Sequence, residues 1–113
     1  MKSKIVALSK NEDFKNLLQK KKASNKYVTI FYGILDNKDI EKLNISFVTK
    51  KKLGNAVKRN KIKRRLKNII NEAIKNMTIK CNYSYLVIAK PTMLNNDYKN
   101  IKETLLQSLK AIR

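Results

Sequence analysis

Residues 50–67 read KKKLGNAVKRNKIKRRLK, and ten of these 18 positions carry a basic side chain. Between Glu41 and Glu72 the chain has no acidic residue, so no neighbouring position neutralises this charge. After Gly54 the apolar residues recur at the spacing that lines one face of a helix, and they are Ile62, Leu66, Ile69, Ile70 and Ala73. The stretch therefore predicts an amphipathic helix over about 55–75 that buries its apolar face and turns its cations outward.

The start of this predicted helix is an unfavourable place for cations. A helix N-terminus carries a partial positive charge, and it is surrounded here by Lys50, Lys51, Lys52, Lys58 and Arg59. Like charges three or four positions apart add about 0.2–0.5 kcal/mol of repulsion per pair. A bound polyanion removes both penalties, and Gly54, which has no Cβ, lets phosphate oxygens approach the N–H groups of the first turn. We predict a phosphate-binding helix N-terminus; the alternative is a solvated basic face.

Length and charge limit the class of protein and the kind of partner. The 113 residues fit one domain spanning residues 1–113, and a hydrophobic content of 42% favours a folded core. The formal net charge of +19 favours a bound polyanion, with nucleic acid as the first candidate and an anionic membrane surface as the second. No run approaches 18 consecutive apolar residues and no signal-peptide core follows Met1, so we expect a soluble, cytoplasmic protein without a membrane partner.

Side chains suited to hydrolytic catalysis are scarce. The chain has no His and one Cys, so it offers neither an intramolecular disulfide nor a zinc site, and Cys81 is expected to be a small apolar filler where a strand begins. Asp36, Asp39 and Glu41 share a loop, where a polar hairpin turn is a better interpretation than a metal site because the spacing follows no ligand pattern. We expect no catalytic side chain and no metal bound by the protein alone.

The N-terminal part of the chain predicts one helix. Ser9 and Glu12 have the spacing of a capping box, and Phe14, Leu17 and Leu18 form the apolar stripe that follows. Basic residues at positions 20–22 suit a helix C-terminus, so the helix is expected to end near Lys22.

β-Branched and aromatic residues predict strands over 27–35, 43–49 and 83–89. The polar loop between the first two favours an antiparallel pair. A last amphipathic helix is expected over about 97–112, capped by Asn95 or Asn96. This order predicts an α+β two-layer domain in which the basic helix packs on one face of the sheet.

Aromatic residues of the first strand offer a second binding surface. Tyr27 and Phe31 alternate with Val28 and Ile30, so the two pairs are expected on opposite faces of the sheet. If the helices leave one face partly open, these rings and Phe14 line a groove on which single-stranded bases stack for about 1–3 kcal/mol each. The alternative is that the rings belong to the core, as aromatic residues of small sheets usually do.

Residues 50–67 closely resemble the signature of the bacterial ribonuclease P protein subunit, including its Arg-Asn-Arg core. The resemblance extends to SKNEDF at 9–14 and YLVIAKP at 85–91, so it covers essentially the whole chain in order. It implies an α-β-β-β-α-β-α sandwich similar to the second domain of ribosomal protein S5, with a left-handed βαβ crossover around the basic helix. It also adds a short strand near 23–26, which composition does not reveal.

The resemblance further implies the activity and its partners. The ribonuclease P RNA subunit, with Mg²⁺ bound by that RNA and the substrate, would be the catalyst. The reaction would be cleavage of precursor tRNA, which releases the 5′ leader and leaves the mature 5′ end. The protein would act as a monomer in a complex of one protein and one RNA.

Two sets of candidate site residues follow. With the phosphate-binding residues above, the RNA-binding set is Lys50, Lys51, Lys52, Asn55, Lys58, Arg59, Asn60, Lys61, Lys63, Arg64, Arg65 and Lys67. The leader-cleft set is Phe14, Leu18, Tyr27 and Phe31. Lys61 stands where the family usually has its second Arg, which keeps the charge but loses the planar fork, and Leu18 stands where an aromatic residue is common.

Three other functions fit the charge. They are a plain RNA-binding ribosomal or assembly protein, an architectural DNA-binding protein that places the basic helix in a groove, and a membrane-surface protein. A membrane-surface protein needs a helix whose apolar face is free, and the apolar stripe here is better used on the sheet. A single-strand cleft beside the basic helix distinguishes precursor-tRNA recognition from generic binding.

Overall fold

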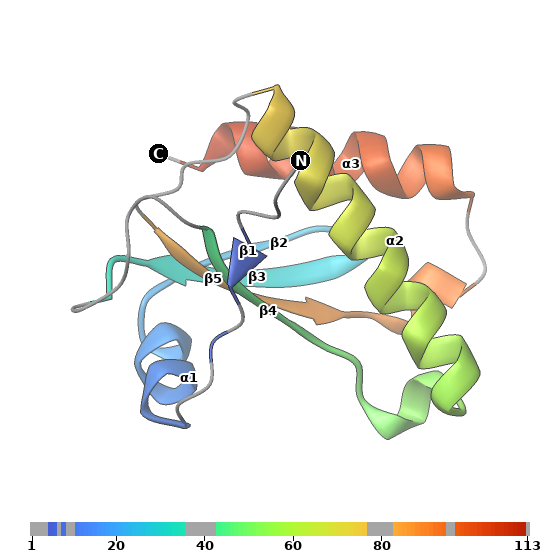
Figure 1. Cartoon of the computed structure of the whole chain (residues 1–113), viewed down its shortest axis with the longest axis horizontal. Coiled ribbons are helices and arrows are strands. Elements are labelled where there is room, and N and C mark those ends of the chain that lie inside the picture. Colours follow the sequence, from blue (N-terminus) through green and yellow to red (C-terminus); the bar gives the residue numbers. More distant parts are fainter. Residues whose placement is uncertain are drawn as a thin grey trace.

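The computed structural model describes residues 5–6, 8, 11–35, 43–76, 83–94 and 97–112. Within these residues a five-stranded mixed sheet is covered by helices on both faces (Figure 1). The strands are β1 (Ile5–Val6), β2 (Lys21–Ser24), β3 (Val28–Gly33), β4 (Leu43–Val48) and β5 (Ser84–Ala89). The helices are α1 (Asn11–Leu18), α2 (Ala56–Lys75) and α3 (Tyr98–Ala111), with 3₁₀ turns η1 (Lys51–Leu53) and η2 (Pro91–Leu94).

The sheet has the strand order β1-β4-β5-β3-β2. β5 is antiparallel to β3 and parallel to β4, so the predicted pairing of β3 with β4 is wrong. The physical reason is the burial of β5 on both faces: Tyr85 and Val87 enter the main core, and Leu86 enters a second cluster on the other side. A strand that is apolar on both faces belongs in the middle of a sheet. The polar sequence between β3 and β4 favoured a hairpin, but it carries no information about the position of β5.

The connection from β4 through α2 to β5 joins neighbouring parallel strands. In Figure 1 the chain leaves the right-hand end of β4, returns leftward through α2 above the sheet, and enters β5 behind β4. This path is the left-handed crossover that the resemblance implies, and it confirms the α-β-β-β-α-β-α order. The two-residue strand β1, which pairs with β4, was not predicted.

The apolar stripe of α2 is buried as predicted. Ile62, Leu66, Ile69, Ile70 and Ala73 are each at most 2% exposed, and they pack with Ile101, Leu105 and Leu109 of α3 over the sheet. Because this stripe lies in the core, α2 has no free apolar face of the kind that a membrane-surface helix needs. No helix in the described ranges has the length and apolarity required to cross a bilayer.

The predicted end of the first helix is wrong. α1 ends at Leu18, and the N–H of Lys20 donates to the carbonyl of Leu17 at 3.0 Å in the turn that follows. Lys21 and Lys22 then enter β2, where pairing with β3 provides partners for the backbone of this segment. β2 also lies at 21–24 instead of 23–26.

Asn25 ends β2 by folding the chain back onto β3. Its Oδ1 accepts the N–H groups of Tyr27 and Val28 at 2.8 and 2.9 Å, and its own N–H donates to the carbonyl of Val28 at 3.0 Å. At the other end of the chain, the residue that caps α3 is Asp97, whereas Asn95 and Asn96 were predicted. Those two asparagines, Ser9, Cys81 and the acidic loop of Asp36, Asp39 and Glu41 lie outside the described residues.

Candidate RNA-binding surfaces

The corner between η1 and α2 positions the basic residues. Leu53 is 1% exposed and anchors η1 in the core. Gly54 follows with φ 125° and ψ −162°, a conformation that is almost restricted to glycine. Asn55 then caps α2, because its Oδ1 accepts the N–H of Lys58 at 3.0 Å. One first-turn donor expected to face phosphate is therefore already satisfied by the protein.

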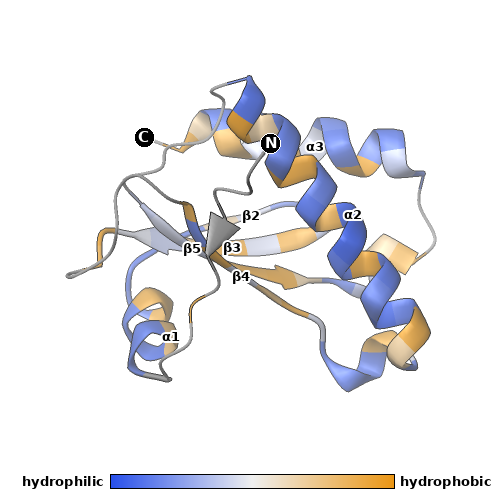
Figure 2. Cartoon of the chain, in the orientation of Figure 1, coloured by the Kyte–Doolittle hydropathy of each residue, from blue (hydrophilic) through white to orange (hydrophobic). Residues whose placement is uncertain are grey.

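The predicted RNA-binding residues lie together on η1 and the outward side of α2. Figure 2 shows hydrophilic colouring along most of the visible surface of this helix. Arg59 and Arg65 are half-buried, and the exposed members are Lys50, Lys51, Lys52, Asn55, Lys58, Asn60, Lys61, Lys63, Arg64 and Lys67. For the ten cations of this set, no ion pair is recorded within the described part of the chain. We call this set the basic surface.

The acidic residue of α2, Glu72, is paired with a lysine of α3. Glu72 accepts from Lys102 of α3 at 2.6 Å, and this hydrogen bond raises the pKa of Lys102 above its usual value. The pair joins α2 to α3 and lies more than three turns from the first turn of α2. The repulsion among the cations of the basic surface is therefore not relieved by this carboxylate.

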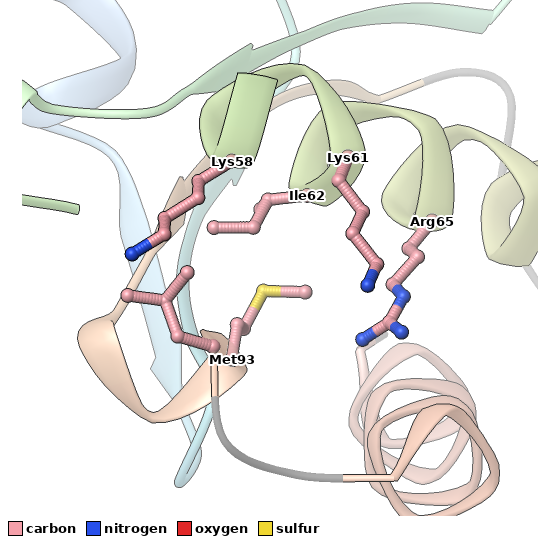
Figure 3. A pocket seen from close by; sticks show the side chains of 6 residues that line it. Lys58, Lys61, Ile62, Arg65 and Met93 are labelled. Atoms are coloured by element: carbon pink, nitrogen blue, oxygen red, sulfur yellow. The ribbon is translucent and has the colours of Figure 1, made fainter. Parts of the chain in front are cut away.

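The cations of α2 lie on two different sides of the helix. Positions 60, 63, 64 and 67 lie toward solvent on the side of α2 away from the core, whereas Lys58, Lys61 and Arg65 face η2 (Figure 3).

The Nε of Arg59 is buried, and it has no hydrogen-bond acceptor among the described residues. An arginine held in this way is positioned by packing and not by an internal salt bridge.

Among the described residues, the helix on the opposite face of the sheet is α1, which is eight residues long (Figure 1). A second cluster lies there, with Leu8, Leu17 and Leu86 buried and Phe14, Phe31, Leu35, Val48 and Ile88 partly buried. Leu18, at the end of α1, is 49% exposed. The structure thus brings Phe14, Leu18 and Phe31 to one face, which we call the open face.

Tyr27 does not belong to the open face. It is 4% exposed and packs in the main core, beneath α2 and α3. Strict alternation placed it beside Phe31, but β3 begins only at Val28. Tyr27 lies in the turn made by Asn25, and its carbonyl accepts the N–H of Lys90 at 2.8 Å. Residues in such a turn do not follow the two-residue period of a strand.

Strand register adds polar side chains that sequence reasoning missed. Lys22 pairs with Phe31, which pairs with Leu86, so the three side chains form one row across the open face. The next row contains Ser24, Thr29, Ile88 and Val48. Lys90 lies beside Ser24 at one end of this second row. Its Nζ donates to Ser24 Oγ at 2.8 Å and to the carbonyl of Asn25 at 2.6 Å. Only the pairing of β2 with β3 reveals this arrangement.

A metal centre is not apparent in the part of the chain that the structure describes, where no group of three or more His, Cys, Asp or Glu side chains gathers. The open face and the basic surface instead present cations, amides, hydroxyls and apolar rings. Such groups are typical of surfaces that contact phosphates and bases.

Comparison with known proteins gives one consistent family. The sequence model of the Ribonuclease P family matches residues 3–113. The ribonuclease P protein component of Carboxydothermus hydrogenoformans is 34% identical over 115 residues, which covers 98% of this chain and 94% of that protein.

Two solved structures share the fold. The RNase P protein from Thermotoga maritima superposes with a TM-score of 0.80 at 24% identity, over 96% of this chain and 98% of that one. A Staphylococcus aureus RNase P protein mutant, described as defective in mRNA degradation activity, gives 0.76 at 28% identity, over 92% and 85%. Because the family model matches nearly the full sequence and a curated relative is 34% identical over 98% of the chain, the chain belongs to the Ribonuclease P family.

Proposed function

We propose that this chain binds the RNA subunit of ribonuclease P through its basic surface and holds the 5′ leader of precursor tRNA on its open face. In this way it assists endonucleolytic removal of the leader. The observation that carries the proposal is that one small domain of this family presents two separate surfaces of different chemistry, on opposite faces of the same sheet.

The basic surface supports binding to a folded RNA. Its cations project from one helix and one 3₁₀ turn that are anchored by buried Leu53 and Ile62, so their spacing is fixed before binding. Cations on a rigid backbone displace counterions from phosphates without the cost of first ordering that backbone. No acidic residue occurs in the first turn of α2, so the partial positive charge of its N-terminus adds to the attraction.

The open face supports binding to a single strand. Phe31 is partly exposed and lies in one row with Lys22, so a base can stack on the ring while its phosphate approaches the ammonium group. Ser24 and Thr29 in the next row offer hydroxyls for sugar or phosphate oxygens. Lys22 and Lys90 thus extend the predicted cleft residues Phe14, Leu18 and Phe31.

Catalysis is assigned to the RNA subunit, with Mg²⁺ bound by that RNA and the substrate and none by the protein alone. Three of the chain's properties support this: it has no His, its Glu72 is engaged with Lys102, and its two surfaces hold groups that bind RNA. The expected assembly is one protein with one RNA, acting in the cytoplasm.

Binding measurements test the proposal against generic nucleic-acid affinity. The protein should bind bacterial ribonuclease P RNA more tightly than duplex DNA of equal length and salt concentration. The assembled complex should also bind precursor tRNA more tightly than mature tRNA. Equal affinity for all these ligands would favour an architectural or ribosomal protein instead.

A further inference from the structure

The flank of α2 that faces η2 encloses a cavity of about 260 Å³ (Figure 3). Its lining is Lys58, Lys61, Ile62, Arg65, Met93 and Leu94. Ile62 and Met93 are at most 2% exposed and form the apolar floor, and Leu94 is 37% exposed at the rim. The three cations lie at positions i, i+3 and i+7 of one helix, so they line one wall.

The residues that line the cavity favour a ligand with an anionic part and an apolar part. Three cations and no acidic residue line the cavity, so charge complementarity requires an anion. Leu94 at the rim offers apolar surface to an uncharged, flat or apolar group, whereas Met93 is 0% exposed and supports the lining from beneath. The volume is below the range of about 300–1,000 Å³ typical of drug-sized ligands, so one ring system fits better than an extended molecule.

A nucleotide combines an aromatic base with an anionic phosphate. We propose that this cavity receives one unstacked nucleotide of the RNA subunit, with its base against Leu94 and its flanking phosphates beside Lys58, Lys61 and Arg65. The inference rests on the proposed function. The RNA subunit is the source because the cavity lies on the α2 side of the sheet, whereas the leader surface lies on the α1 side. Base contacts there would add position-specific recognition to the nonspecific phosphate contacts of the basic surface.

A photo-crosslinking amino acid at position 94 tests the placement in the assembled complex. Position 34 is the matched control, since Ile34 is 60% exposed and lies at the end of β3, apart from α2 and η2. The position-94 probe should crosslink to one or a few unpaired nucleotides of ribonuclease P RNA, and the position-34 probe should not reach them. An assembled complex in which position 94 crosslinks only to the leader, or to no RNA, overturns the inference.

The salt dependence of RNA binding distinguishes the base contact in the cavity from the phosphate contacts. Leu94→Ala removes three side-chain carbons and should weaken RNA binding roughly fourfold for each of them that the base buries, without changing the salt slope. Arg65→Ala should weaken binding and reduce the slope by about one unit, and Ile34→Ala should change neither quantity. Thermal melting identifies any variant that is misfolded.

Failure of the inference is distinguishable from failure of the proposed function. If folded Leu94→Ala binds as tightly as the parent while Lys67→Ala weakens binding, the cavity is not a base site but the basic surface stands. If neither changes binding, both are overturned.

Discussion

Lys22 of β2 and Phe31 of β3 are direct partners in the antiparallel ladder, so an ammonium group and an aromatic ring share one row of the open face. Leu86 of β5 continues this row beyond the ring and is buried at 3% exposure. The row therefore passes from a solvated cation through a partly exposed ring to a buried floor. This gradation suits a base stacked on Phe31 with its phosphate directed toward β2.

The Phe31→Ala substitution should weaken binding of precursor tRNA by about 1–3 kcal/mol, because it removes one stacking surface. Binding of mature tRNA and of ribonuclease P RNA should be unchanged, since neither presents a leader. Equilibrium binding to the assembled complex measures both affinities.

Phe47→Ala is the matched control for Phe31→Ala. Phe47 is also partly buried, but it packs against the main core on the other face of the sheet. Its loss should lower thermal stability without altering the preference for precursor over mature tRNA. A normally folded Phe31→Ala protein that keeps the parent preference would refute the leader assignment and leave the basic surface untouched.

Arg64→Ala and Lys67→Ala should each weaken binding to ribonuclease P RNA. If about six phosphates are contacted, the slope of log K against log salt should be on the order of −4 to −5 in the parent, and each substitution should reduce it by roughly one unit. Lys110→Ala removes the same charge from the exposed C-terminal end of α3 and should have little effect. Binding that barely depends on salt would contradict the role of the basic surface.

The elements with a strong local pattern were predictable from the sequence. The stripe from Ile62 to Ala73 has the helical period, and the structure buries all five of its members. The end of β5 at Ala89, just before Lys90-Pro91, also follows from local chemistry.

Elements decided by long-range pairing were not predictable. β5 lies between β3 and β4, although 35 residues separate the end of β4 at Val48 from the start of β5 at Ser84. Lys22 carries no local sign of being in a strand, and it becomes a neighbour of Phe31 only because β2 pairs with β3. Tyr27 does not lie in the predicted cleft. The side chain of Asn25 makes a turn at this point, so the two-residue alternation of a strand does not apply, and the ring of Tyr27 lies in the core.

Asn55→Asp should separate stability from RNA binding. Asp caps a helix as well as Asn does and adds a negative charge at the N-terminus of α2, so the free protein should gain about 0.3–1 kcal/mol of stability. The same charge repels phosphate, so RNA affinity should fall. Chemical denaturation and binding isotherms measure the two effects, and Asn55→Ala, which loses the cap, should reduce stability by about 1 kcal/mol. Tighter RNA binding by Asn55→Asp would show that no phosphate lies near this helix end.

Gly54→Ala should destabilise the free protein by about 1–3 kcal/mol, because a residue with a Cβ is strained at φ 125°. The new Cβ would lie 2.8 Å from Cδ of Lys58, a flexible side chain that can move, so the backbone accounts for most of the loss. Thermal melting checks this prediction. An unchanged melting temperature would mean that the corner between η1 and α2 adjusts without cost.

Cleavage of precursor tRNA by reconstituted particles at low Mg²⁺ tests the central claim most directly. Purified protein is mixed with bacterial ribonuclease P RNA and precursor tRNA, and the mature 5′ end is quantified against RNA alone and against nuclease-treated protein alone. We predict that the protein restores correct cleavage at Mg²⁺ concentrations where the RNA alone is nearly inactive, and that the protein alone cleaves nothing. Equal cleavage with and without the protein, or cleavage by the RNA-free protein, would contradict the proposed function.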